Sequence, residues 1–425
     1  MNNSQLTGNR SFFLLWTGNA LSLVGFHGAR IAYPLLILAT TDSLAAAGWV
    51  GFALGAPNLI FPILSGIIAD RFERLRILMI CQVVGLLAAC VVATAVLAEA
   101  RHLAALVLAA AFVEGAVNVF AEACELGAIS DVVSLEQRPL AFAFLEAEQP
   151  IALLLGRAAG GAIFGLARWL PFIVDAATYL YCLIALALIR PNRTRRDPVA
   201  PAPRPRSHDL GAGIRVVWRE PLLRVTTAAL GMSNLIIQIV LLLILFELQT
   251  TGHAAWTAGV VLSSAGIGGI LGAACSHWFT ARWSARWIYR AGLWGWTGLL
   301  LPIASSDNPI VLAVCWGGVG AVGVVSNIAL TLYRTAVIPE HMLGRALAAM
   351  GLVSSGAVAL GALAAGYLLA MFGSSVVGWL TLTAMLILAI GAGYEPGRAE
   401  TPLVAASKQV PEIRWGSGSV SHEHE

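Results

Sequence analysis

The chain has 425 residues, of which 58% are apolar and only 12% are charged. A helix that crosses a bilayer needs roughly 20 mostly apolar residues, so this apolar content is enough for about twelve such helices. The low charged fraction and the net charge of only +3 argue against a soluble enzyme, a disordered regulator and a nucleic-acid-binding protein.

In chain order, apolar runs separated by charges, proline or glycine predict twelve transmembrane helices. They cover residues 11–39, 44–69, 75–98, 102–129, 139–166, 169–190, 222–247, 255–279, 286–304, 308–332, 343–370 and 374–394. A long polar insertion rich in proline and arginine follows the sixth run and is typical of an extended linker. We expect an all-α membrane protein with one six-helix bundle in residues 1–190, a linker with an amphipathic segment in 191–221, a second six-helix bundle in 222–398 and a tail in 399–425.

The distribution of basic residues predicts the orientation of the chain. If the N-terminus is cytoplasmic, nearly all loop lysines and arginines fall on the cytoplasmic side, and only Arg101 and Arg168 lie outside. Cytoplasmic loops of membrane proteins carry this positive excess. We therefore expect a multi-pass protein of the bacterial plasma (inner) membrane with both termini in the cytoplasm.

The two halves of the sequence resemble each other at an offset of 205 residues. At this offset three glycine pairs coincide, namely Gly115 with Gly320, Gly156 with Gly361 and Gly161 with Gly366. Parallel repeats of this kind are typical of secondary transporters. The offset predicts two bundles related by a pseudo-two-fold axis.

Polar side chains recur on one face of several predicted helices at the 100° spacing of an α-helix. We interpret these faces as walls of a substrate and proton cavity, formed by Asn19, Arg30, Tyr33, Glu114, Asn118, Glu146, Gln149, Arg157, Asn234, Gln238 and Asn327. A charge in the middle of the bilayer costs about 2.5 to 3.5 kcal/mol, so such residues usually have a function. Glu122 and Glu125 share the face of Glu114 but approach the helix end, where solvation alone also explains them.

Glu114 is the predicted proton carrier, because an arginine stays protonated and cannot exchange a proton. In this hypothesis Glu114, together with Glu146, alternates between a protonated state and a state paired with Arg30 or Arg157. The alternative is a static buried ion pair that only fixes helix packing.

The segment GIIADRFERLRIL, residues 66–78, resembles the signature loop of the major facilitator superfamily. The matching positions are Gly66, Asp70, Arg71, Arg74 and Arg76, while Glu73 stands where the family usually has glycine. The resemblance implies a cytoplasmic gating loop, in which the glycine permits close helix approach and the aspartate pairs with arginines or a helix N-terminus. A plain positive-inside loop explains the arginines but not the spacing of the glycine and the aspartate.

Further segments are similar to the macrolide-efflux and enterobactin-exporter branch of that superfamily. They are SFFLLWTGNALSLVGF from residue 11, PFIVDAATYL from 171, GIRVVWREPLLR from 213 and LGRALAAMG from 343. This resemblance implies the major facilitator fold, a cavity lined by the first, fourth, seventh and tenth helices, and rocking of the two bundles. It also implies proton-coupled export of a small amphipathic organic molecule such as a drug or a siderophore.

The fifth predicted helix resembles the Gly-Pro-x-x-Gly-Gly element of antiporters in the superfamily. Gly156, Gly160 and Gly161 match, whereas Arg157 replaces the proline and removes the expected kink. The same glycines also fit a seam of small residues between packed helices.

Two other classes of function stay open from the sequence. One is an importer or facilitator of the same fold, and the other is a membrane scaffold or sensor that transports nothing. No phosphate-binding loop, nucleophile elbow or zinc spacing occurs in the sequence, so we predict no enzyme activity, no cofactor and no metal site. The expected partners are a small-molecule substrate, the proton as coupling ion and membrane lipids, with no nucleic acid and a monomeric state.

Overall fold

The computed structural model describes residues 9–134, 136–189, 210–338 and 340–393, which are helical and contain no β-strand. The first half contains α1 (Arg10–Thr41), α2 (Leu44–Gly55), α3 (Pro57–Ile60), α4 (Pro62–Arg71), α5 (Arg74–Leu97), α6 (Leu103–Val132), α7 (Arg138–Leu166) and α8 (Leu170–Ala187). The second half contains α9 (Leu210–Arg219), α10 (Pro221–Thr250), α11 (Ala255–Arg282), α12 (Ala285–Ser305), α13 (Pro309–Val337) and α14 (Glu340–Gly393).

The described helices account for the expected twelve spans. Nine of them are long and apolar enough to cross a membrane, and α2–α4 make a tenth span if they are counted together. Helix α14 has 54 residues and breaks at Gly373, where φ is 74°, so it supplies two spans. The nine include α14 as one helix. When its two segments are counted separately and α2–α4 and α12 are added, the total is twelve spans, so the all-α twelve-helix fold predicted from the sequence is confirmed.

The second predicted span, residues 44–69, is not one straight helix as expected. Pro57 and Pro62 begin new helical segments, and the chain bends by 54° between Leu44–Ile60 and Pro62–Arg71. Proline lacks the N–H that would continue the helix, and its ring clashes with the preceding turn. The apolar run hides this break because it continues through both prolines.

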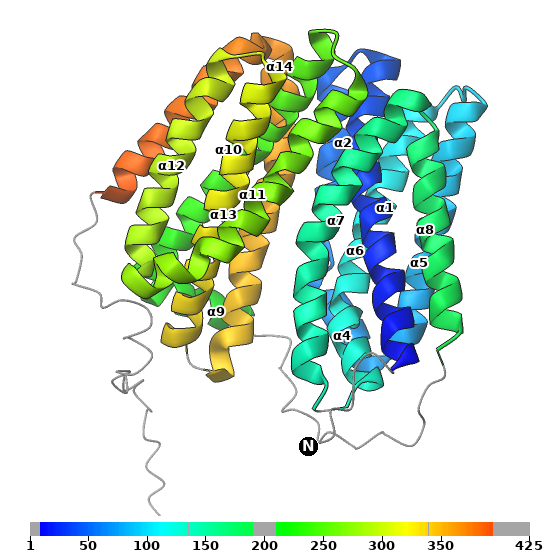
Figure 1. Ribbon diagram of the computed structural model, residues 1–425, viewed down its shortest axis with the longest axis horizontal. Coiled ribbons are helices and arrows are strands. Elements are labelled where there is room, and N and C mark those ends of the chain that lie inside the picture. Colours follow the sequence, from blue (N-terminus) through cyan, green and yellow to red (C-terminus); the bar gives the residue numbers. More distant parts are fainter. Residues whose placement is uncertain (1–8, 135, 190–209, 339, 394–425) are drawn as a thin grey trace, which may run out of the picture.

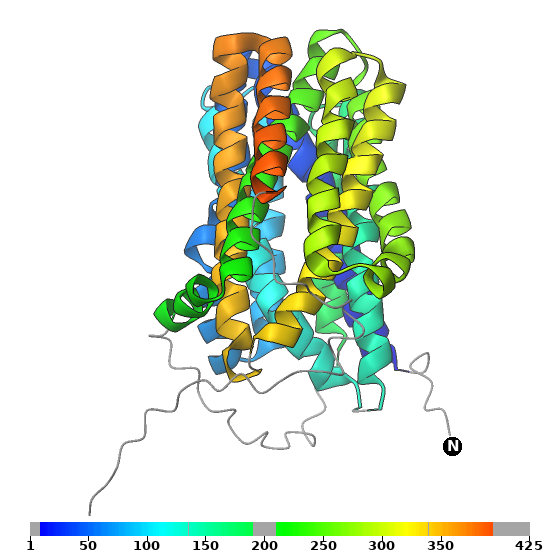
Figure 2. The same ribbon diagram turned by 90° about the vertical axis from the view of Figure 1, so that its left-hand side faces the viewer.

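Successive spans run in alternating directions, so their ends define two faces. We call the face at which α1 begins the N-terminal face, at the bottom of Figure 1, and the other the distal face. Helices α1–α8 stand on one side of the molecule and α9–α14 on the other (Figure 1). Helix α9 lies obliquely at the N-terminal face with Val217 buried and Trp218 exposed (Figure 2). It falls in the expected amphipathic segment, whereas residues 190–209 and the tail lie outside the described residues.

Two seams of small residues join the halves on the distal side. Gly161 of α7 lies against Gly259 of α11, and Gly366 of α14 lies against Gly48 of α2. The absence of side chains lets the helix backbones approach closely. Because Gly161 and Gly366 are related by the 205-residue offset, the two seams are equivalent positions of the repeat.

The apolar core is shared by both halves only toward the distal face. One cluster contains residues from both, for example Leu36 of α1 and Leu242 of α10. Toward the N-terminal face, a second cluster that includes Phe12 draws only on the first half, and a third that includes Met350 draws only on the second. The halves therefore pack together at one end and separately at the other.

Candidate functional site

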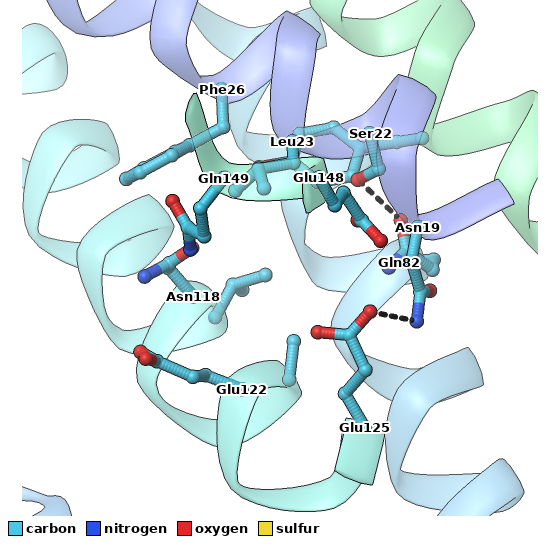
Figure 3. A pocket seen from close by; sticks show the side chains of 13 residues that line it. Asn19, Ser22, Leu23, Phe26, Gln82, Asn118, Glu122, Glu125, Glu148 and Gln149 are labelled. Carbon is cyan, nitrogen blue, oxygen red and sulfur yellow. Dashed lines mark hydrogen bonds between the residues drawn. The ribbon is translucent and has the colours of Figure 1, made fainter. Parts of the chain in front are cut away.

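Helices α1, α5, α6, α7 and α8 line a cavity of about 50 Å³ in the first half, which is open on one side (Figure 3). Its polar lining comprises Asn19, Ser22, Gln82, Asn118, Glu122, Glu125, Glu148, Gln149 and Tyr179. Along α1 the cavity lies between Leu15, which belongs to the core of the first half, and Ala29, which belongs to the shared core. We call it the acidic cavity; it lies at the level where the halves separate.

Hydrogen bonds hold part of this lining in place. Asn19 Nδ2 donates to Glu125 Oε1 at 2.9 Å, and Ser22 Oγ donates to Gln82 Oε1 at 3.1 Å. Glu148 is only 3% exposed, and its Oε2 has no hydrogen-bond partner among the described residues. The carboxylates of Glu125 and Glu148 point into the same space (Figure 3). The cavity thus combines fixed amides with an acid that lacks a partner.

A second polar group is buried deeper in the first half. Tyr33 Oη donates to Glu114 Oε1 at 2.7 Å, and both side chains are fully buried. Asp175 of α8 interacts electrostatically with Glu114, and its two carboxyl oxygens lack hydrogen-bond partners in the described part of the chain. Gly25 of α1 leaves room for Asp175. Two carboxyl groups therefore interact with each other, and the hydroxyl of Tyr33 donates to only one of them.

Two arginines occupy a separate place, between the halves. Arg30 of α1, Arg157 of α7 and Gln238 of α10 supply the polar lining of a cavity of about 30 Å³. Arg157 Nη1 donates to the backbone carbonyl of Leu262 in α11 at 3.4 Å, which links the halves. The positive charges of Arg30 and Arg157 lie close enough to interact. This cavity is basic, whereas the first is acidic.

The structure therefore distributes the predicted cavity over three places. Asn19, Asn118 and Gln149 share the acidic cavity. Glu114 contacts Tyr33, and among the described residues it forms no ion pair with either arginine. The pairing of Glu114 with Arg30 or Arg157 is absent from this conformation, because the acid faces the interior of the first half and the arginines face the second; the alternation between two states stays a prediction.

Five predicted cavity residues line neither of these two cavities: Tyr33 and Glu114, which bond to each other, and three more. Asn327 and Glu146 are exposed, and Asn234 Nδ2 donates to Ser354 Oγ of α14. Ideal helical spacing places Glu146 closer than Glu148 to the face of Gln149. The packing of α7 instead buries Glu148, so Glu148 replaces Glu146 in the lining.

Sequence reasoning missed several buried polar residues. Gln82 is an amide inside the otherwise apolar helix α5, which is a usable signal. Asp175 lies in the segment PFIVDAATYL but is not among the predicted cavity residues, and Arg334 belongs to the basic residues that the orientation argument assigns to loops. Arg334 is in fact buried near Tyr289. Charge counting alone does not reveal which residues of a helix end turn inward.

The gating loop forms ion pairs other than the expected ones. Arg74 Nη1 lies 3.3 Å from Asp131 Oδ1 of α6, and Arg76 Nε lies 2.7 Å from Glu73 Oε2. Asp70 is exposed and forms no ion pair with a described residue, and Arg71 is exposed at the end of α4. A side chain at Gly66 would meet no described atom within 4 Å, so close helix approach does not explain this glycine here.

Residues 15–284 match the family model of the Major Facilitator Superfamily, which is more than half of the chain. The chain belongs to the major facilitator superfamily. As a member, it is a multi-pass membrane transporter of small molecules rather than an enzyme.

Solved structures with the same fold agree with this assignment. A crystal structure of the nucleoside transporter NupG has a TM-score of 0.72 and 14% identity, and covers 90% of this chain and 98% of its own. A crystal structure of a D-xylose-proton symporter has a TM-score of 0.62 and 14% identity, and covers 90% of this chain and 97% of its own. At this identity the similarity establishes the fold alone. No curated protein sequence matches the chain.

Proposed function

We propose that this protein is a proton-coupled secondary transporter that exports a small amphipathic organic molecule by alternating access. The observation that carries the proposal is the division of the apolar core, which is shared at the distal face and split at the N-terminal face. The acidic cavity lies at the level of this division. Such an arrangement suits a carrier that opens to one side of the membrane at a time.

The arginine distribution supports an N-terminal face in the cytoplasm. With this orientation, the described conformation is closed to the outside and separated toward the inside. Export then requires the halves to rock, so that the two glycine seams part while the ends at the N-terminal face come together. This movement carries the solute across without any helix leaving its own bundle.

For proton coupling we propose Glu114 together with Asp175, in place of an arginine-paired Glu114. Two ionised carboxylates buried next to each other in a membrane are costly, and one bound proton removes half of that charge. The hydroxyl of Tyr33 stabilises the charge that stays on Glu114. Proton binding there changes the packing between α1, α6 and α8.

The proposed direction rests on the segments that resemble the macrolide-efflux and enterobactin-exporter branch, such as PFIVDAATYL from residue 171. An importer of the same fold is the second candidate. The solved structures of low identity do not bear on direction, because they establish the fold alone.

Uptake into everted membrane vesicles tests the function. Vesicles that contain the protein should accumulate members of a panel of antibiotics and siderophores when the lumen is acid, and not when the gradient is collapsed. The variants Glu114→Gln and Asp175→Asn should uncouple uptake from the gradient. Gradient-driven accumulation only in right-side-out vesicles would establish the importer, and unchanged pH dependence in both variants would remove the proton role of this pair.

A further inference from the structure

The acidic cavity brings three carboxyl groups together without a basic side chain in its lining. Glu122, Glu125 and Glu148 line it, and no lysine or arginine does. Among the described residues, none of these three acids forms an ion pair. Carboxylates that are withdrawn from water need a cation or a proton to offset the loss of solvation. The cavity therefore has an unmet requirement for positive charge.

Glu148 shows most clearly that an acid in this cavity lacks a partner. Only 3% of the residue is exposed to solvent, and its Oε2 has no hydrogen-bond partner in the described chain. The carboxylate points into the cavity toward Glu125 (Figure 3). A buried acceptor without a partner is rare in native structures, and at a cavity wall it is available to a ligand.

The residues that line the cavity indicate which kind of cation it can hold. No three histidine, cysteine, aspartate or glutamate residues of the described chain are placed so that they could hold a metal ion. Leu23, Phe26 and Val117 form an apolar wall beside the acids. An aromatic ring such as that of Phe26 also attracts organic cations through its face. A positively charged group with an attached apolar part fits this lining better than an inorganic ion.

We propose that the acidic cavity binds an organic cation, with its ammonium or guanidinium group between Glu125 and Glu148 and its apolar part against Phe26. This inference rests on the proposed transport function and specifies the substrate class. Glu122 and Gln149 are exposed members of the lining, so the ligand enters between them. The basic cavity of Arg30 and Arg157 lies apart from this site and repels the cation from the distal route.

Direct binding to the purified full-length protein in detergent tests the inference. The probes are phenethylamine, benzylamine and phenylguanidine, with 2-phenylethanol as a neutral analogue and phenylacetate as an anionic one. At least one cation should bind, and the neutral and anionic analogues should not compete with it. Glu148→Gln should weaken cation binding at least about tenfold, because the buried charge pair is lost.

The matched control is Glu136→Gln, which removes an exposed carboxylate in front of α7; it should bind the cation as the unmodified protein does. If Glu148→Gln does not fold, Glu125→Gln gives the same test. Absence of binding by all three cations, equal binding of the neutral analogue, or an affinity of the folded variant equal to the control would overturn the inference. Vesicle transport of neutral or anionic solutes without cation binding would defeat only this inference, whereas cation binding without any transport would defeat the proposed function and leave the site intact.

Discussion

The hydroxyl group of Tyr33 is the hydrogen-bond partner of Glu114, and both side chains are withdrawn from solvent. The ring of Tyr33 also packs edge-on against Phe172, with ring centroids 5.0 Å apart. A substitution by phenylalanine distinguishes these two interactions, because it keeps the ring and removes only the hydroxyl. Leaving a buried acceptor without its donor costs about 1 to 3 kcal/mol.

Tyr33→Phe should therefore destabilise the protein by about 1 to 3 kcal/mol, seen as a lower apparent Tm in detergent, and should reduce proton-driven uptake. In a Glu114→Leu background, the same substitution should cost much less, because the acceptor is gone. Tyr181→Phe serves as control, since Tyr181 is exposed on the same helix as Asp175. Equal losses of Tm in the two backgrounds would show that the hydrogen bond contributes nothing.

At the scale of single residues, the sequence predicts which helix faces are polar but not what each face meets. The 100° spacing places Asn19, Asn118 and Gln149 each on the polar face of its own helix, and the structure places all three in the acidic cavity. The same spacing favours Glu146 over Glu148, because it carries no information on the neighbour that buries a given side of the helix. Partners such as Tyr33 for Glu114 depend on tertiary packing and are beyond reach of a single sequence.

At the scale of helices, the two glycine seams decide how closely the halves approach. A side chain at Gly48 would collide with the backbone of Gly366, and one at Gly366 would collide with Gly48 and Leu44. Forcing extra atoms into a packed contact typically costs about 1 to 3 kcal/mol. The packing of α2 against α14 is therefore sensitive to larger side chains at these glycines, although the seam contains no charged residue.

Gly48→Val should lower the apparent Tm and impair transport, because it separates α2 from α14. The comparison variant is Gly391→Val in the last segment of α14, where a side chain meets no described atom within 4 Å. Thermal unfolding and vesicle uptake measure both variants in parallel. A Tm and a transport rate for Gly48→Val that equal those of Gly391→Val would refute the role of this seam.

Hydrophobic runs predict the spans well because their length and composition are set by the bilayer. The break at Gly373 coincides with the boundary predicted between residues 370 and 374. The break between α2 and α4 was missed, since both Pro57 and Pro62 lie inside one apolar run. A proline within a span therefore needs its own test, separate from the count of apolar residues.

For the whole molecule, the shared core defines which end of the transporter is closed. Trp49 of α2 and Tyr367 of α14 meet beside this closed region, where Trp49 Nε1 donates to Tyr367 Oη at 3.0 Å. A conformational cycle that opens the distal face has to separate them. A covalent link between these positions therefore provides a direct test of the cycle.

In a background without the six native cysteines, Trp49→Cys combined with Tyr367→Cys should be joined by a bifunctional methanethiosulfonate reagent and lose transport. Reduction should restore transport, and each single variant should be insensitive to the reagent. Crosslinking is read from electrophoretic mobility and transport from vesicle uptake. Full transport by the crosslinked protein would rule out separation of α2 and α14 during the cycle.

If the glycine seams part while the opposite ends meet, the axis of rotation lies near the middle of the bilayer. In a bilayer about 30 Å thick, a tilt of roughly 10° about such an axis displaces each end by about 3 Å. The ion pair of Arg74 and Asp131 at the N-terminal face is then displaced about as far as the seams, in the opposite direction. A small rotation is therefore enough to exchange which end of the path admits water.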